Sequence, residues 1–244
     1  EMYRTRPAPA QLTSFYLMMS VGGVLGGFFC AIVAPLLFDW TWEHPILILM
    51  AAALLPAIPL LRLNENDKRL PLIMVVIGMI ALALGLFGGI SEPVESSFTK
   101  ILLAATIMTL GIAVAGFRIP FLLAVAGLLT INGGWYSVQQ SLDGVRMRSY
   151  FGTYTVNASE SGRVRWLNHG TTMHGMQLLD DPTRPISYYP DTSGVGIAML
   201  NAPRLYGPEA SIGVVGLGTG TLACYRRPGQ YWQLFEIDPL VIEI

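Results

Sequence analysis

Between Leu12 and Tyr136 the chain holds five long apolar runs, and its few charged residues there lie between the runs or near their ends. Each run approaches the roughly 20 residues that an α-helix needs to cross the hydrocarbon core of a bilayer. Only 13% of all residues are charged and the mean hydropathy is +0.51, whereas soluble proteins carry about 25% charged residues. We therefore predict a multi-pass helical membrane region over residues 1–136, with spans at Leu12–Phe38, Pro45–Leu63, Leu70–Ile90, Phe98–Phe117 and Ile119–Trp135.

The first run carries two overlapping glycine pairs at a spacing of four, Gly22 with Gly26 and Gly23 with Gly27. Small residues at this spacing allow two helices to approach closely in lipid. A flexible helix without a particular partner would carry the same pattern, so both interpretations stay open. No run has an ionisable residue at its centre, which argues against an autonomous ion-coupled transporter.

From Asp143 onward, charged residues reach the density of a soluble protein. Alternating apolar and polar residues, interrupted by a turn at Gly162, indicate short β-strands, and a later apolar stretch indicates a helix. We expect a small β subdomain at 137–190 and a second unit at 191–244. The predicted elements are a polar linker at Ser137–Arg148, strands at Ser149–Asn157, Arg163–His169 and Thr171–Leu178, and a helix at Ser193–Leu205.

The stretch from Ile212 to Asp238 predicts a nucleotide-binding unit. A β-branched run enters a turn with glycine at Gly216, Gly218 and Gly220, and a helix is predicted at Thr221–Arg226. A second apolar run, Tyr231–Phe235, ends in Glu236 and Asp238. Glycines let the backbone pass close to a ligand, a helix N-terminus attracts anionic groups, and an acidic residue about 20 positions on accepts hydrogen bonds from ribose hydroxyls. We predict an α/β unit of the Rossmann type, truncated after its second strand.

Charge and cysteine content exclude several other classes. The formal net charge is −1, and nothing indicates a nucleic-acid partner. Cys30 and Cys224 are far apart in the sequence, so neither a disulfide framework nor a metal site follows from them. His169 and His174 are five residues apart without further ligands at a recognisable spacing, so we predict no metal site. We expect the two histidines to line the ligand cleft or to pack beside the glycine turn.

One further side chain is a candidate for the cleft on weaker grounds. Asp181 follows Asp180 and precedes Pro182 in a polar segment. Such a residue either caps a turn or faces a substrate amine, and turn chemistry is the commoner role.

An ordered set of short motifs gives the C-terminal half a resemblance to a known family. It resembles the spermidine synthase family, and more closely its membrane-fused bacterial branch, in which transmembrane helices precede a synthase-like domain. The motifs are Arg148-Ser-Tyr-Phe-Gly152, Leu167-Asn-His-Gly170, His174-Gly-Met-Gln177, Tyr188-Tyr189, Ser193-Gly-Val-Gly196, Gly216-Leu-Gly-Thr-Gly220 and Glu236-Ile-Asp-Pro239.

The resemblance implies a small β-domain followed by a methyltransferase-like Rossmann domain. It implies a role in polyamine biosynthesis, in which decarboxylated S-adenosylmethionine donates an aminopropyl group to an amine, with no tightly bound cofactor. The glycine turn with Thr219 would hold the cosubstrate, and Glu236, followed by Asp238, would take the ribose hydroxyls. Gln177 would match the glutamine of the family's Asp-Gly-x-x-Gln strand, and Tyr188 the tyrosine of its Tyr-His-Glu segment.

The sequence also departs from the family pattern at two positions. The family's glycine turn usually carries an aspartate where this chain has Thr219, and the His-Glu pair is replaced by Tyr189-Pro190. In the family, both positions help to hold cationic amine groups. Their loss removes charge-assisted hydrogen bonds worth roughly 1.5–3 kcal/mol each.

The distribution of charged residues between the predicted spans conflicts with the expected location of the C-terminal half. Basic residues lie on one side of the five predicted spans and acidic residues on the other, and the basic side is expected to be cytoplasmic. Five spans would then place the C-terminal half outside the cell, whereas the cosubstrate is expected inside. We predict a multi-pass protein of the bacterial inner membrane with a cytoplasmic C-terminal half, which requires a different span count or an exception to the rule. The loop residues concerned are Arg4, Arg6, Arg62, Lys68, Arg69 and Arg118 on the basic side, and Asp39, Glu43, Glu92, Glu95 and Lys100 on the other.

Three alternatives remain beside aminopropyl transfer: an S-adenosylmethionine-dependent methyltransferase, a non-catalytic membrane sensor, scaffold or transporter-associated module, and a NAD-dependent dehydrogenase. The expected partners are the lipid bilayer, a polyamine-like amine and, by analogy with soluble relatives, further copies of the chain. Two strands and one helix cannot cover both faces of a parallel sheet. We therefore expect the sequence to be part of a longer protein. The resemblance implies that the catalytic aspartate lies beyond Ile244, so we expect this part to be inactive by itself.

Overall fold

The computed structural model describes residues 7–55, 58–61, 68–90 and 97–244. The chain divides into two compact units, one formed by Thr41–Gly144 and the other by Glu1–Trp40 together with Val145–Ile244. Several residues used above for topology lie outside the described residues, and so does part of the predicted second span. These residues are Arg4, Arg6, Arg62, Glu92 and Glu95.

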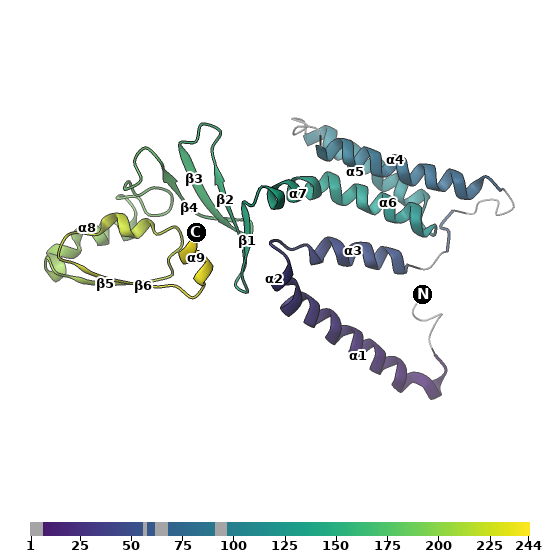
Figure 1. Cartoon of the computed structure of the whole chain (residues 1–244), viewed down its shortest axis with the longest axis horizontal. Helices are drawn as coiled ribbons and strands as arrows, with labels where there is room; N and C mark the ends of the chain where they lie inside the picture. Colours follow the sequence, from purple (N-terminus) through teal and green to yellow (C-terminus); the bar gives the residue numbers. More distant parts are fainter. Residues whose placement is uncertain (1–6, 56–57, 62–67, 91–96) are drawn as a thin grey trace. The chain divides into compact units, whose positions relative to one another are not determined.

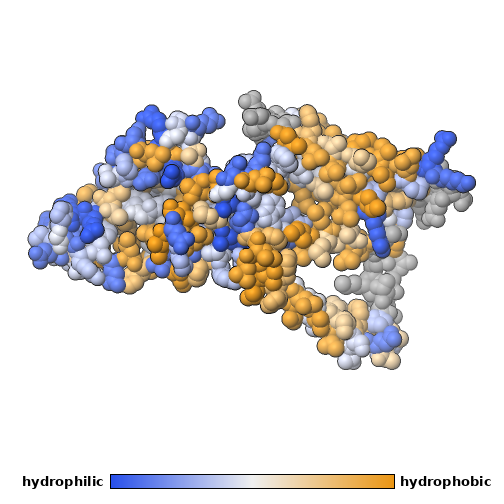
Figure 2. Space-filling view, viewed as in Figure 1, coloured by the Kyte–Doolittle hydropathy of each residue, from blue (hydrophilic) through white to orange (hydrophobic). Residues whose placement is uncertain are grey.

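The unit Thr41–Gly144 is a bundle of apolar helices. Small or aliphatic residues form its core, while large apolar side chains cover its outer surface (Figure 2). This distribution is the opposite of a water-soluble bundle and suits a lipid environment. The helices are α3 (Glu43–Leu54), α4 (Leu70–Ile90), α5 (Ser97–Ala113), α6 (Arg118–Leu129) and α7 (Trp135–Leu142).

Helices α4 and α6 approach each other through glycine (Figure 1). A Cβ atom placed on Gly85 would collide with the backbone of Gly127, and one on Gly78 would lie 2.6 Å from the Cα of Pro120. Backbone atoms cannot move aside as a flexible side chain does. The two helices are therefore in backbone contact at these positions.

The helical segments partly match the predicted spans. Three of them are long and apolar enough to cross a membrane by length and composition: Pro9–Leu37, Leu70–Ile90 and Arg118–Leu142. Two further apolar helices among the described residues are shorter, Glu43–Leu54 and Phe98–Ala113. These segments indicate a membrane protein.

The predicted polar linker Ser137–Arg148 is wrong over its first half, because the helical stretch that begins at Arg118 continues to Leu142. A kink at Thr130–Gly134 joins α6 to α7, because Asn132 and Gly133 leave the helical conformation and Gly133 has a φ of +95°. The polar residues of α7 include the buried Gln140, so they belong to a packed helix and not to a linker.

The first helical segment consists of α1 (Leu12–Phe28), a π-helical turn at Phe29–Val33 and α2 (Ala34–Leu37). Its four glycines at positions 22, 23, 26 and 27 have open space around them, since a Cβ added to any of them would meet no atom of another element within 4 Å. Both interpretations of the glycine spacing therefore stay open.

The segment after Val145 begins with a four-stranded antiparallel sheet in the order β1-β2-β3-β4. The predicted strand Ser149–Asn157 starts too early, because its first four residues form a tight turn with a hydrogen bond from Ser149 N to Gly152 O (2.9 Å) and β2 begins at Thr153. The short strand β1 lies in the predicted linker instead. The other two predicted strands are confirmed to within one residue. The bounds are β1 Arg146–Arg148, β2 Thr153–Ala158, β3 Val164–His169 and β4 Thr172–Leu178.

The remaining elements are α8 (Gly194–Tyr206), β5 (Ser211–Val215), β6 (Tyr231–Phe235) and α9 (Pro239–Glu243). Strands β5 and β6 run side by side and are parallel, with Val215 opposite Phe235 (Figure 1). Helix α8 begins where predicted, since the side chain of Ser193 accepts a hydrogen bond from the Gly196 amide at 3.0 Å.

The predicted helix Thr221–Arg226 is only a short 3-10 turn over Thr221–Tyr225. Gly220 precedes it with a left-handed backbone, and Arg226 follows it in an extended conformation two residues before Pro228, so the turn does not continue as an α-helix. A small core of Tyr154, Leu167 and Val241 joins the antiparallel sheet to α9. The chain is thus a helical region followed by an α/β region.

Candidate functional site

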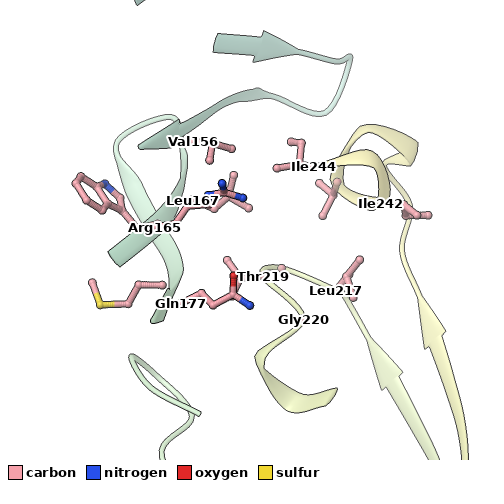
Figure 3. Close-up of a pocket in the computed structure, with 13 residues that line it drawn as sticks. Val156, Arg165, Leu167, Gln177, Leu217, Thr219, Gly220, Ile242 and Ile244 are labelled. Carbon is pink, nitrogen blue, oxygen red and sulfur yellow. The ribbon is translucent and has the colours of Figure 1, made fainter. Parts of the chain in front are cut away.

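A cavity of about 240 Å³ lies between the antiparallel sheet and the glycine turn (Figure 3). Arg165 of β3 and Gln177 of β4 line it from the sheet. Leu217, Thr219 and Gly220 line it from the glycine turn, and apolar residues of α9 line a further side. Residues from distant parts of the sequence therefore meet around one hollow.

The glycine turn has a left-handed backbone conformation, which residues with a side chain adopt only at a cost in free energy. Gly216, Gly218 and Gly220 have φ angles of +86°, +56° and +70°, a left-handed region that favours glycine. The turn also touches the sheet directly, because a Cβ on Gly175 of β4 would collide with the Thr219 hydroxyl. Glycine on both sides thus allows the turn and the sheet to come close together.

The carboxylate of Glu236 fixes the position of the glycine turn through hydrogen bonds to backbone amides. Its Oε2 atom accepts a hydrogen bond from the Leu217 amide at 2.7 Å, and its Oε1 atom accepts from the amides of Ile237 and Asp238 at 2.8 and 3.0 Å. The Asp238 and Leu217 amides lower the pKa of this carboxyl, because they stabilise its charged form. The carboxylate ties the end of β6 to the turn after β5.

Asp238 is almost completely buried, with 2% of its surface exposed. Its Oδ2 atom accepts hydrogen bonds from the hydroxyls of Ser149 (2.5 Å) and Tyr154 (2.8 Å), and its Oδ1 atom accepts from the Leu240 amide at 3.0 Å. Burial by itself would raise the pKa of Asp238, but these hydrogen bonds outweigh it and the pKa is lowered. Burial, followed by the hydrogen bond to Asp238, raises the pKa of Tyr154 to about 12. This cluster fastens the antiparallel sheet to α9.

The two candidate histidines pack beside this cluster. The ring of His169 stacks on Tyr154 with centroids 4.6 Å apart, and His174 lies 5.3 Å from His169. Neither histidine lines the cavity. Among the described residues, no group of three or more potential ligands of the His, Cys, Asp or Glu type could hold a metal ion.

A second hollow of about 290 Å³ adjoins the first and shares Gln177, Thr219 and Gly220 with it. Pro182 and Arg184 line its other side. The neighbouring Asp181 accepts a hydrogen bond from Thr183 at 3.3 Å, as expected for turn chemistry. Tyr188 is 55% exposed and lines neither hollow.

The structure therefore separates the candidate residues into two groups. Gln177, Gly218, Thr219 and Gly220 line the cavity. Glu236, Asp238 and the residues that pack around them lie behind the turn, where they fix its position. The sequence analysis missed Arg165, which lies opposite Gln177 in the β3–β4 register. Cross-strand pairing would have identified it once the register of the hairpin was known.

Comparison with models of known protein families gave no match, and comparisons with curated proteins and with solved structures gave none either.

Proposed function

We propose that the cavity beside the glycine turn binds an S-adenosyl cosubstrate, and that the protein is a membrane-anchored transferase of the spermidine synthase type. The observation that carries the proposal is the glycine turn itself, held by Glu236 and facing Gln177 across a hollow. Together with the parallel pair β5–β6 that flanks the turn, it supports a Rossmann-like unit of the methyltransferase type. The motifs quoted above support the assignment to this family.

The chemistry follows from the bonds of the cosubstrate. An amine nitrogen attacks the carbon next to the sulfonium, the carbon–sulfur bond breaks, and its electron pair stays on sulfur. The attacking nitrogen loses one proton. Sulfonium is already a good leaving group, so the protein contributes mainly by orienting the two reactants.

The arrangement assigns a role to each part of the cavity. The open turn leaves room for the nucleoside, because no side chain projects from Gly216 or Gly218. Gln177 projects from β4 toward Thr219 and Gly220 (Figure 3), where its amide can bind the tail of the cosubstrate. Glu236 does not line the cavity, so its role here is to fix the turn through the Leu217 amide rather than to bind the ribose hydroxyls as the resemblance implied.

The proposal places the C-terminal half in the cytoplasm, where the cosubstrate is made, with an amine as acceptor and the helices in the bilayer. Further copies of the chain are proposed partners by analogy with soluble relatives. Methyl transfer from intact S-adenosylmethionine is the second candidate, and the charge of the cavity favours it, as argued below.

Calorimetric titration of the full chain in detergent micelles tests the proposal. We expect binding of an S-adenosyl ligand and no binding of NAD. Gln177→Ala should lower the affinity for the S-adenosyl ligand about 10-fold, which corresponds to the loss of one hydrogen bond. Gln233→Ala on the exposed face of β6 is the control and should bind normally. Binding of NAD without binding of any S-adenosyl ligand would refute the proposal.

A further inference from the structure

One side chain of the cavity stands apart from the others by its charge. Arg165 has the only ionisable side chain among the described residues that line the cavity. The other lining side chains are apolar or neutral, among them Val156, Leu167 and Ile242. A ligand group that reaches this position therefore meets a single positive charge.

Arg165 lies where the tail of a ligand bound at the glycine turn would end. It pairs with Gln177 across the β3–β4 hairpin, so both side chains project from the same face of the sheet. Figure 3 shows both side chains projecting from the sheet into the cavity, Gln177 toward Thr219 and Arg165 toward the side of Ile244. A molecule with its nucleoside at the glycines would thus present its other end to Gln177 and Arg165.

The charge of Arg165 is not neutralised by another described residue. No ion pair joins it to a described carboxylate, whereas Arg163, two residues earlier, pairs with Asp180 at 2.9 Å on the surface. A guanidinium offers two parallel N–H donors that match a carboxylate. Arg165 is itself exposed, so water screens its charge in part and the preference for a carboxylate depends on the two paired donors.

We propose that Arg165 binds the carboxylate of the cosubstrate, so that the cavity selects S-adenosyl ligands that retain this group over the decarboxylated form. This inference rests on the proposed S-adenosyl site and, within it, favours the second candidate, methyl transfer from intact S-adenosylmethionine, over aminopropyl transfer. The cavity has no acidic side chain to hold a free amine tail, since Thr219 and the other described lining residues have neutral or basic side chains. Intact S-adenosylmethionine supplies the complementary anion, and its decarboxylated form does not.

The experiment compares three ligands and four proteins by calorimetry. The ligands are S-adenosylmethionine, S-adenosylhomocysteine and decarboxylated S-adenosylmethionine; the first two carry the carboxylate. The proteins are the full chain in detergent micelles, Arg165→Gln, Arg165→Lys and the matched control Arg163→Gln. Arg163 is an exposed arginine of the same hairpin, so its replacement removes the same charge away from the cavity.

We expect the unmodified protein to prefer the two carboxylate-bearing ligands by about 10–100-fold. Arg165→Gln should abolish this preference and leave the affinity for the decarboxylated ligand unchanged, which also shows that the cavity is intact. Arg165→Lys should keep part of the preference, because the charge remains but the paired donors are lost. Arg163→Gln should behave as the unmodified protein does.

Two results would overturn the inference alone. One is that the unmodified protein binds the decarboxylated ligand as tightly as the other two or more tightly. The other is that Arg165→Gln lowers the affinity for all three ligands by the same factor. Either would leave the proposed S-adenosyl function standing. Failure of all three ligands to bind the unmodified protein would instead refute the proposed function, and the inference with it.

Discussion

The helical unit Thr41–Gly144 and the glycine turn of the C-terminal region both depend on glycine, but for different physical reasons. Gly85 is an ordinary right-handed helical residue, and its missing side chain makes room for the backbone of a neighbouring helix. Gly216 has open space around it and a φ of +86°. Position 85 requires a small side chain, whereas position 216 requires a residue that tolerates a left-handed backbone. Different substitutions should therefore distinguish the two positions.

The glycines of α1 form a third case. Gly22 is helical, like Gly85, and has open space around it, like Gly216. Neither of the two requirements applies to it within its own unit, Glu1–Trp40 with Val145–Ile244. Substitutions at this position therefore serve as a common control for the two other kinds of glycine.

The largest effect is expected for Gly85→Leu. The new side chain would meet the backbone of Gly127, so α4 and α6 must separate, at a cost of about 3 kcal/mol or more. Thermal unfolding of the protein in detergent micelles measures the loss. Gly22→Leu adds the same side chain to open space and should leave the unfolding temperature nearly unchanged. Equal losses in both variants would contradict the assigned α4–α6 contact.

The second largest effect is expected for Asp238→Ala. The change leaves the hydroxyls of Ser149 and Tyr154 without their acceptor, which costs about 3 kcal/mol. Hydrogen exchange of β2 and α9 should accelerate, since the carboxylate joins these elements. Asp180→Ala removes a carboxylate from an exposed ion pair and should have little effect. Unchanged exchange in Asp238→Ala would show that the cluster does not fasten the sheet to α9.

A smaller effect is expected for Gly216→Ala. Alanine in a left-handed conformation costs about 1–2 kcal/mol, although the added methyl group meets no other atom. Gly216→Asn should cost less, because asparagine tolerates this region better. Exchange protection of β5 and β6 reports the change. If Gly22→Ala destabilised α1 as much as Gly216→Ala destabilises the glycine turn, the left-handed backbone of Gly216 would not explain the loss of stability.

The smallest effect concerns pH. The pKa values of Glu236 and Asp238 are lowered in the folded chain, so the unfolded chain binds more protons than the folded chain near the ordinary carboxyl pKa of about 4. Stability is then fully present above this range and is lost as the pH falls through the lowered pKa values. Asp238→Asn should have a lower free energy of unfolding than the unmodified protein at neutral pH, and this free energy should fall less on acidification. Denaturant unfolding between about pH 2 and 7 measures both. A slope equal to that of the unmodified protein would contradict the assignment.

Much of the local structure could be predicted from the sequence. The apolar runs gave the helices, and the alternating residues gave β3, β4 and β6 to within one residue. The failures were at boundaries. Ser149–Gly152 forms a turn inside a predicted strand, and Leu142 ends a helix inside a predicted linker. Both boundaries depend on hydrogen bonds that residue patterns do not specify.

The site was predictable only in part for a related reason. Thr219 and Gln177 were candidates because short motifs contain them. Arg165 has no motif of its own, and it belongs to the site because the β3–β4 register places it opposite Gln177. A shift of one residue in that register would turn it to the other face of the sheet.

The sequence by itself determined the apolar helices, the left-handed glycine turn and the carboxylates at the end of β6, because periodicity and backbone preference are local properties. Only the tertiary structure decided which glycines bring two helices into contact and which carboxylate is buried. Asp238 finds its partners 84 and 89 residues away in Tyr154 and Ser149. Such partners depend on how the elements pack, and packing is set by contacts between distant segments rather than by the pattern within any one of them.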